Sequence, residues 1–329
     1  MIENINLEVT TSCPFRCPQC YCAFKTQKNL DIEIGKYWIR EAAKNECKYI
    51  SISGGESLLY PHLYELISFA SSFKLKCAVS FSGFGFNEDV YAKLVRAGIN
   101  NIHISLNGST DIINGFTREG YIYSIKAIEL LKNKSQCSKS INWVMTKSNC
   151  DDFNNIIKIA EKNNFDYIQV IGYKPENHNQ IKFLPTYSQM KMMVELIRNY
   201  KGKVNIIVEN CYSQLKAMLF DNGFWGNYNR GRLKGCIAGN GAISISVDGK
   251  LSPCRHLYIY EEASTIEEYL SNSIALKQIR VALSDFKEPC INCQYRYNCI
   301  HCLAINYNLY DNLLFGDINC PLKEKKQKA

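Results

Sequence analysis

Three cysteines near the start of the chain are spaced closely enough to share one metal cluster. They are Cys13, Cys17 and Cys20, in a C-x3-C-x2-C pattern. Three thiolates can hold a [4Fe–4S] cluster and leave its fourth iron without a protein ligand, whereas four cysteines fill every iron. An open iron can chelate a small molecule. The spacing therefore predicts a cluster that does chemistry on a bound ligand.

The rest of the chain argues against the commoner uses of clustered cysteines. It has 16 cysteines among 329 residues, and residues 1–6 lack the basic and apolar regions of a signal peptide. Disulfides persist mainly in oxidising compartments, so we expect a cytoplasmic protein with metal clusters or free thiols. No apolar run reaches membrane-spanning length and no nucleic-acid module is evident, so we expect neither partner.

A second motif, Gly54-Gly55-Glu56, follows the cysteines on the next predicted strand. The cysteine triad followed by this turn resembles the radical S-adenosylmethionine (SAM) enzymes, in which the amino and carboxylate groups of SAM occupy the open iron. The resemblance implies reductive cleavage of SAM to a 5′-deoxyadenosyl radical, which abstracts hydrogen from an inert C–H bond. The cofactor supplies this chemistry, and the protein supplies positioning and exclusion of solvent.

The resemblance also implies which residues hold SAM: Gly54, Gly55, Glu56, Ser105 and Arg118. In the family the glycine-glycine-glutamate turn binds the amino group, the serine binds the ribose and the arginine pairs with the carboxylate. The alternatives are a serine that ends a strand and an arginine that is a surface charge. One position departs from the family: Gln19 precedes the third cysteine where an aromatic residue is usual, and Tyr21 follows it.

Seven further cysteines lie near the end of the chain: Cys236, Cys254, Cys290, Cys293, Cys299, Cys302 and Cys320. The array resembles the SPASM domain of radical SAM peptide maturases, which binds two auxiliary [4Fe–4S] clusters and so implies three clusters in all. By position, auxiliary cluster I would be held by Cys236, Cys254 and Cys302. Auxiliary cluster II would be held by Cys290, Cys293, Cys299 and Cys320. The alternative is a zinc site built from the two C-x2-C pairs, which leaves three of the seven cysteines without a role.

Auxiliary cluster I receives only three cysteines from this array. The nearest upstream cysteine is Cys211, which follows a predicted strand at the end of the barrel where the radical would form. Cys211 is a candidate catalytic residue that donates a hydrogen atom to the substrate radical. It could instead be the fourth ligand of auxiliary cluster I or an inert thiol, since buried free cysteines are common.

Short β-branched segments alternate with helical patterns and must position these motifs. Strands are predicted at 6–10, 49–53, 76–80, 101–106, 141–146, 167–172 and 204–208. This alternation predicts an α/β fold, a partial (β/α)6 TIM-like barrel with its chemistry at the C-terminal strand ends, followed by an iron–sulfur SPASM domain. A hairpin is predicted from residues 242–247 and 250–253 around Asp248-Gly249.

The expected domains are a barrel over 1–210, a linker over 211–235, the SPASM domain over 236–322 and a basic tail over 323–329. The net charge is +8, and four lysines of the last seven residues contribute to it. A solvated tail is the expected role of these lysines, with attraction of an acidic peptide as the alternative.

The resemblance favours a ribosomally synthesised peptide as substrate, modified by a thioether or C–C crosslink or by epimerisation. The chain begins directly at the first predicted strand, so we expect a separate leader-recognition protein or a peptide bound in the barrel groove. An electron donor such as flavodoxin or ferredoxin is the other expected partner. One alternative is dehydrogenation or epimerisation of a small molecule such as an aminoglycoside. The other is sulfatase-type formylglycine formation, which Arg255 disfavours because those enzymes carry an aspartate base at that position.

Overall fold

The computed structural model describes residues 2–21, 26–221, 235–285, 287–296, 299–313 and 316–322. A nine-stranded sheet runs through the molecule in the order β7-β6-β5-β4-β3-β2-β1-β8-β9. All neighbouring strands are parallel except the β8–β9 pair. The strands are β1 (Asn4–Thr10), β2 (Tyr49–Gly54), β3 (Lys76–Phe81), β4 (Asn101–Ser105), β5 (Ser138–Met145), β6 (Tyr167–Gly172), β7 (Asn205–Val208), β8 (Ala242–Ile245) and β9 (Leu251–Ser252).

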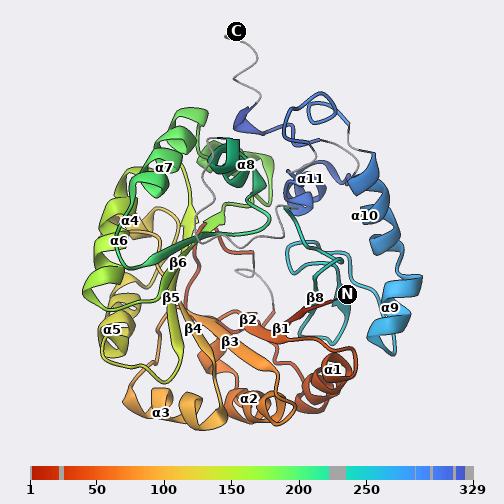
Figure 1. Cartoon of the computed structure of the whole chain (residues 1–329). Helices are drawn as coiled ribbons and strands as arrows, with labels where there is room; N and C mark the ends of the chain where they lie inside the picture. The colour runs from red at the N-terminus through yellow and green to blue at the C-terminus, as the bar shows by residue number, and fades with distance from the viewer. Residues whose placement is uncertain are drawn as a thin grey trace.

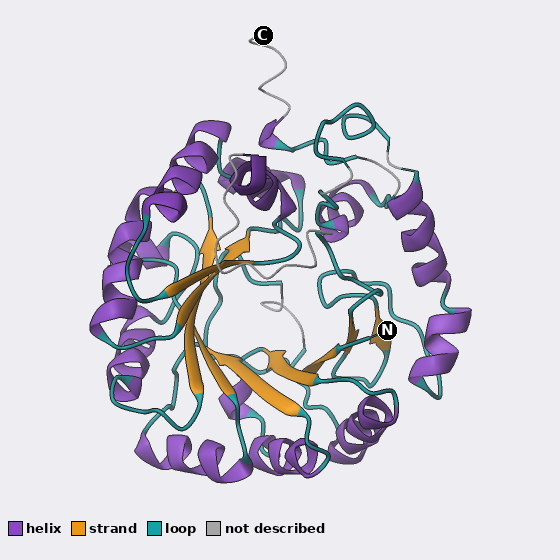
Figure 2. Ribbon diagram, viewed as in Figure 1, coloured by secondary structure: helices purple, strands orange, loops and turns teal. Residues whose placement is uncertain are grey.

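The strands curve around the interior of the molecule and the helices cover their outer side (Figures 1 and 2). The helices of the barrel are α1 (Ile32–Lys44), α2 (Leu63–Ser72), α3 (Glu88–Ala97), α4 (Asp111–Gly115), α5 (Tyr121–Leu131), α6 (Phe153–Lys162), α7 (Tyr187–Asn199) and α8 (Ser213–Asp221). Helices α9 (Ile266–Asn272), α10 (Ile274–Ser284) and α11 (Leu303–Tyr310) follow the hairpin. The predicted partial barrel is confirmed, with a strand at each of the seven predicted positions.

The two faces of the sheet differ in chemistry: the face under the helices is apolar, and the face toward the interior of the barrel is polar. On β5, Ile141, Trp143 and Met145 are fully buried beneath the helices. Burying side chains of this size stabilises the fold by roughly 1.5–3 kcal/mol each. The alternating residue Asn142 instead lines a cavity inside the barrel, together with His103 of β4. The period of two therefore gives an apolar outer face and a polar lumen.

Capping residues define where helices of the outer layer begin. Asp31 caps α1 by accepting hydrogen bonds from the backbone N–H groups of Glu33 and Ile34, at 2.8 and 3.2 Å. Thr186 and Gln189 form a capping box at the start of α7. Such caps satisfy N–H groups that the first turn leaves unpaired, so the loops before them end at defined points.

The hairpin predicted around Asp248-Gly249 is confirmed, since β8 and β9 pair in antiparallel fashion. Its place in the molecule is a finding that the sequence did not indicate. Strand β8 pairs in parallel with β1, from Asn4 opposite Ala242 to Leu7 opposite Ile245. The region that carries the late cysteines therefore continues the sheet of the barrel.

The segment expected as a linker, 211–235, contains α8 in its first half. Residues 222–234 of that segment and the basic tail 323–329 lie outside the described residues. Within the described ranges, no helix has the length and apolar character that crossing a membrane requires.

Candidate functional site

The residues predicted to hold the first cluster and SAM lie together at the C-terminal ends of β1 to β4. They line one cavity of about 1130 Å3. Its lining includes all eight predicted residues: Cys13, Cys17, Cys20, Gly54, Gly55, Glu56, Ser105 and Arg118. Since parallel strands end at the same edge of a sheet, residues from distant parts of the chain converge here.

The three cysteines occupy a loop that follows β1 and is held from outside. The backbone N–H of Glu119 donates to the Cys17 sulfur at 3.3 Å, and the Cys20 N–H donates to the Cys17 carbonyl at 3.0 Å. Burial raises the pKa of the Cys13 thiol to about 11, and Glu56 and the other two thiols add to the rise against a backbone hydrogen bond from Phe15. Thiolates gathered this closely need a compensating positive charge, which a metal provides. The donor set therefore fits an iron–sulfur cluster.

The glycine-glycine turn packs closely against the backbone that leads from β1 into the cysteine loop. The Gly55 N–H donates to the Thr10 carbonyl at 2.7 Å, and the Glu56 N–H donates to the Ser12 carbonyl at 2.8 Å. A Cβ atom on Gly54, whose φ is +138°, would lie 2.2 Å from the Thr10 oxygen, and one on Gly55 would lie 2.3 Å from the Ser12 oxygen. Only glycine fits at both positions, because real Cβ atoms do not approach backbone oxygens this closely.

Glu56 is 1% exposed and joins β2 to β3. Its Oε2 accepts hydrogen bonds from the backbone N–H of Ser82, at 2.9 Å, and from the Ser82 hydroxyl. Burial raises the pKa of this carboxyl group, while the bonds from Ser82 and the charge of Arg118 oppose the rise. The other oxygen, Oε1, accepts a long bond of 3.5 Å from Leu58 and retains acceptor capacity toward the cavity.

Arg118 extends into the same cavity from the loop after α4. Its charge acts on both Cys17 and Glu56, lowering the pKa of each against their burial. The Arg118 Nε is buried and has no hydrogen-bond partner among the described residues. A buried guanidinium N–H without an acceptor is costly, so its presence fits a site that receives a carboxylate from a ligand.

Asn107 is a functional position that the sequence did not single out. Its side chain donates to Gln19 Oε1 at 2.9 Å and accepts from the Val144 N–H at 3.1 Å. Together these two hydrogen bonds connect the cysteine loop to β5 of the barrel. Gln19, at the position where an aromatic residue is usual, therefore serves to anchor the loop. Tyr21 packs on His256, with ring centroids 4.6 Å apart, and so links the loop to the C-terminal region.

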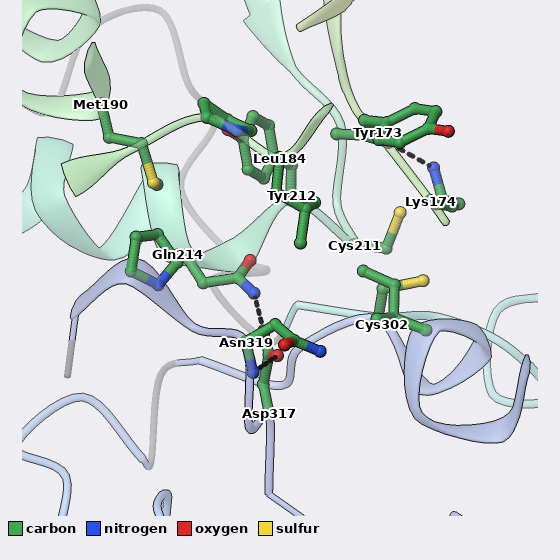
Figure 3. A pocket seen from close by; sticks show the side chains of 14 residues that line it. Tyr173, Lys174, Leu184, Met190, Cys211, Tyr212, Gln214, Cys302, Asp317 and Asn319 are labelled. Atoms are coloured by element: carbon green, nitrogen blue, oxygen red, sulfur yellow. Dashed lines mark hydrogen bonds between the residues drawn. The ribbon is translucent and has the colours of Figure 1, made fainter. Parts of the chain in front are cut away.

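A second cavity of about 1130 Å3 lies deeper in the barrel. Its lining includes the three cysteines assigned to auxiliary cluster I and also Cys211: Cys211, Cys236, Cys254 and Cys302. A hydrogen bond with Cys302 and then burial raise the pKa of the Cys211 thiol, and Figure 3 shows these two side chains next to each other. Cys211 in turn raises the pKa of Cys236 and Cys254, after the larger effect of burial. The fold thus brings four thiols together.

The cysteines assigned to auxiliary cluster II form a separate group beside the start of α8. Burial raises the pKa of Cys299 to about 12 and of Cys290 to about 11, and the charges of the other cysteines of the group add to it. Cys299 lies 3.3 Å from the Ser213 hydroxyl, and the Asp317 N–H donates to the Cys290 sulfur at 3.3 Å. Burial raises the pKa of the Cys320 thiol, and the charges of Cys299 and Cys290 add to the rise.

The thiol sites differ from a single-ion site. In the part of the chain that the structure describes, no three His, Cys, Asp or Glu side chains are placed to hold a single metal ion. The cysteines assigned to auxiliary cluster I line one cavity together with Cys211, and Cys299, three positions before Cys302, belongs to the other group.

A wall of polar and charged residues is common to the two cavities. It consists of Ser80, Asn142, Lys174, Glu209, Arg255 and His256, and the apolar Ile171 also belongs to both linings. Lys174 Nζ lies 2.9 Å from Glu209 Oε2, and Arg255 donates to the Ser53 hydroxyl at 2.9 Å. Burial alone would lower the pKa of Arg255, but the neighbouring Tyr21, Cys254 and Glu209 raise it. The sequence indicated only Arg255 among these, through its position next to Cys254.

Comparison with known proteins adds the following findings. The sequence profile of the radical SAM superfamily matches residues 7–160. The structure is similar to that of Streptococcus suis SuiB bound to S-adenosylmethionine, with 17% identity over 97% of this chain and 77% of that chain and a TM-score of 0.76. SuiB bound to its precursor peptide SuiA matches with the same identity and TM-score, over 97% of this chain and 76% of that one. The structure of anSMEcpe with bound AdoMet and the Kp18Cys peptide matches with 14% identity over 98% of this chain and 95% of that chain and a TM-score of 0.75.

Proposed function

The chain is a radical SAM enzyme, and from this premise we propose that it modifies a ribosomally synthesised peptide. The modification is a thioether or C–C crosslink or an epimerisation. The observation that carries the proposal is the wall shared by the two cavities. The first three cysteines line the cavity on one side of this wall, and four more cysteines line the cavity on the other side. Two structures of similar fold, SuiB with SuiA and anSMEcpe with Kp18Cys, were solved with peptides bound, which supports a peptide here.

In this proposal the first cavity holds a [4Fe–4S] cluster and SAM. Cys13, Cys17 and Cys20 would hold the cluster, and Arg118 would bind the SAM carboxylate. The turn at Gly54–Glu56 would orient the amino group, and Ser105 the ribose. When bound, the cluster and SAM supply the 5′-deoxyadenosyl radical. The role of the protein is to place the reacting C–H bond beside that radical and to exclude water.

We further propose that Cys211 is the fourth ligand of auxiliary cluster I, with Cys236, Cys254 and Cys302. Its place in the lining of one cavity with these three thiols supports this role over that of a hydrogen donor. Auxiliary cluster II would be held by Cys290, Cys293, Cys299 and Cys320, which gives three clusters in the chain. Interleaved ligands of this kind would hold the C-terminal region together around its clusters.

The arrangement disfavours the sulfatase-type alternative. An aspartate beside the cysteine of cluster I would serve as a base, but this chain has Arg255 there. Its neighbours raise the pKa of that guanidinium, so it stays charged and cannot accept a proton.

Peptide modification is testable with synthetic peptides encoded by any short open reading frame found beside the gene. We expect the reconstituted enzyme, given SAM and dithionite under anaerobic conditions, to modify one of the encoded synthetic peptides. Mass spectrometry in heavy water reports a crosslink as a lower peptide mass and an epimer as incorporated deuterium. Enzyme without SAM is the control. Conversion of an aminoglycoside, with all such peptides unchanged, would contradict the proposal.

Arg118→Ala should weaken SAM binding while leaving the iron content unchanged. Loss of a charge-assisted bond to a carboxylate is worth about 1.5–3 kcal/mol, or roughly ten- to a hundredfold in Kd. Equilibrium binding of SAM to the iron-loaded protein measures the change. Arg96→Ala, which removes an exposed arginine in the last turn of α3, is the matched control. Equal SAM affinity in the two variants would place the carboxylate site elsewhere.

A further inference from the structure

Lys174 is a buried cation that lines both cavities of the proposed site. It follows β6, and its side chain is 7% exposed. Its Nζ donates to the Gly172 carbonyl at 3.1 Å and to Glu209 Oε2 at 2.9 Å. An ammonium group has three donors, so one remains for another acceptor.

The surroundings of Lys174 include the thiols proposed for auxiliary cluster I. Lys174 lines the SAM cavity, the deeper cavity with Cys211 and Cys302, and a third cavity of about 480 Å3 that also contains these two cysteines. In the view of Figure 3 the Cys211 sulfur lies between the Lys174 ammonium and Cys302. Burial alone would lower the pKa of Lys174, but Cys211, Glu209 and Cys302 raise it.

A second lysine shows that this environment is specific to Lys174. Lys216 is also buried near Cys211, and its Nζ donates to Asn210 Oδ1 at 2.6 Å. Burial lowers the pKa of Lys216, and the charges of Cys211 and Glu209 only partly oppose it. Lys174 differs from it in geometry, because Lys174 lines all three cavities and pairs with Glu209, whereas Lys216 lines none of these three.

The ion pair with Glu209 does not by itself account for a buried lysine. Removing two charges from water costs about as much as their attraction returns, so such a pair is weak evidence for stability. A cluster with four thiolates carries net negative charge, and net charge is one of the factors that set its reduction potential. A cation fixed beside two of the thiolates would favour the more negative, reduced form.

We propose that Lys174 is a positioning residue that raises the reduction potential of auxiliary cluster I and so prepares this cluster to accept an electron. Glu209, on the other side of the same ion pair, has the opposite effect. The inference rests on the proposed ligand set of Cys211, Cys236, Cys254 and Cys302. The step concerned is the gain of one electron by the cluster, which adds one negative charge and moves no atom. In the experiment below, dithionite supplies that electron.

Redox titration of the full-length, iron-loaded chain tests this proposal. Alanine at Cys13, Cys17 and Cys20 removes the electron paramagnetic resonance (EPR) signal of the first cluster from the background. Cys236→Ala in the same background identifies which remaining signal belongs to auxiliary cluster I. The midpoint potential of that signal is then measured in Lys174→Gln, which keeps a donor for Glu209, and in Glu209→Gln.

We expect the two substitutions to shift the midpoint in opposite directions. Lys174→Gln should shift it to a more negative value by at least about a tenfold change in the reduction equilibrium, which is 59 mV for one electron. Glu209→Gln should shift the midpoint to a more positive value. Lys174→Arg keeps the positive charge and should therefore have the midpoint of the unsubstituted protein. Lys139→Met is the control, because Lys139 is also buried but donates to the Leu131 carbonyl at the other end of the strands.

A structural disturbance would shift both midpoints the same way, and this result would overturn the inference, as would unchanged midpoints. If Lys174→Gln loses iron, the Glu209→Gln midpoint decides: a positive shift supports the inference and no shift overturns it. If the unsubstituted cysteine array binds no iron, the proposed ligand set itself is wrong. That outcome is distinguishable, because iron content is measured before any potential.

Discussion

Replacing Cys13, Cys17 and Cys20 together with alanine should abolish SAM cleavage while about eight of about twelve iron atoms remain bound. The radical requires an iron without a protein ligand, and among the described residues only this triad offers three thiols in the cavity shared with Arg118 and Glu56. The proposed auxiliary clusters would be held by cysteines on other elements and should load normally. Iron analysis after anaerobic reconstitution and chromatography of 5′-deoxyadenosine measure the two effects.

The matched control replaces three buried cysteines that lie outside both arrays, namely Cys47, Cys77 and Cys137. These thiols belong to the hydrophobic core, so the control variant should keep its iron and its SAM cleavage. Zinc in place of iron in both proteins would refute the cluster assignments. Residual 5′-deoxyadenosine formation by the first variant would show that the radical forms elsewhere.

Cys211→Ala should remove about four iron atoms, or leave a cluster with an altered EPR spectrum, and should keep SAM cleavage. The reason is that Cys211 shares a cavity with Cys236, Cys254 and Cys302 and lies next to Cys302 (Figure 3). Cys150→Ala is the control, since Cys150 is buried and forms its hydrogen bond with the Thr146 carbonyl. It should change neither iron content nor spectrum.

The same variant separates the other two roles of Cys211. Full iron and an unchanged spectrum, together with return of starting material, would assign it as the hydrogen donor of an epimerase. Full iron with normal product would make it an inert thiol. Either result would leave auxiliary cluster I with three protein ligands.

Much of the fold follows from local signals. The strands alternate with helices at regular spacing, and Asp248-Gly249 is a turn that needs little context, so the barrel and the hairpin were predictable. The pairing of β8 with β1 was not, because it joins residues more than 230 positions apart and both strands have apolar, β-branched sequences that suit many partners. Register between distant strands is a tertiary property.

The site divides in the same way. The cysteines and the glycine turn carry fixed spacings, so their grouping in one cavity could be predicted from the sequence. Lys174, Glu209 and Asn107 lie in loops after strands, where no period marks an inward side chain. Their roles depend on partners distant in sequence, such as Cys211 for Lys174 and Gln19 for Asn107, that only the folded chain brings near.

The pairing of β8 with β1 has a consequence for any attempt to study the barrel as a fragment. Without residues 242–245, the backbone N–H and C=O groups of Asn4 to Leu7 on that side would lose their partners. An uncovered strand edge recruits other strands and favours aggregation. A fragment that ends before β8 would therefore keep the proposed SAM site but lose the strand that covers β1. Such a shortened protein would need another way to cover its first strand.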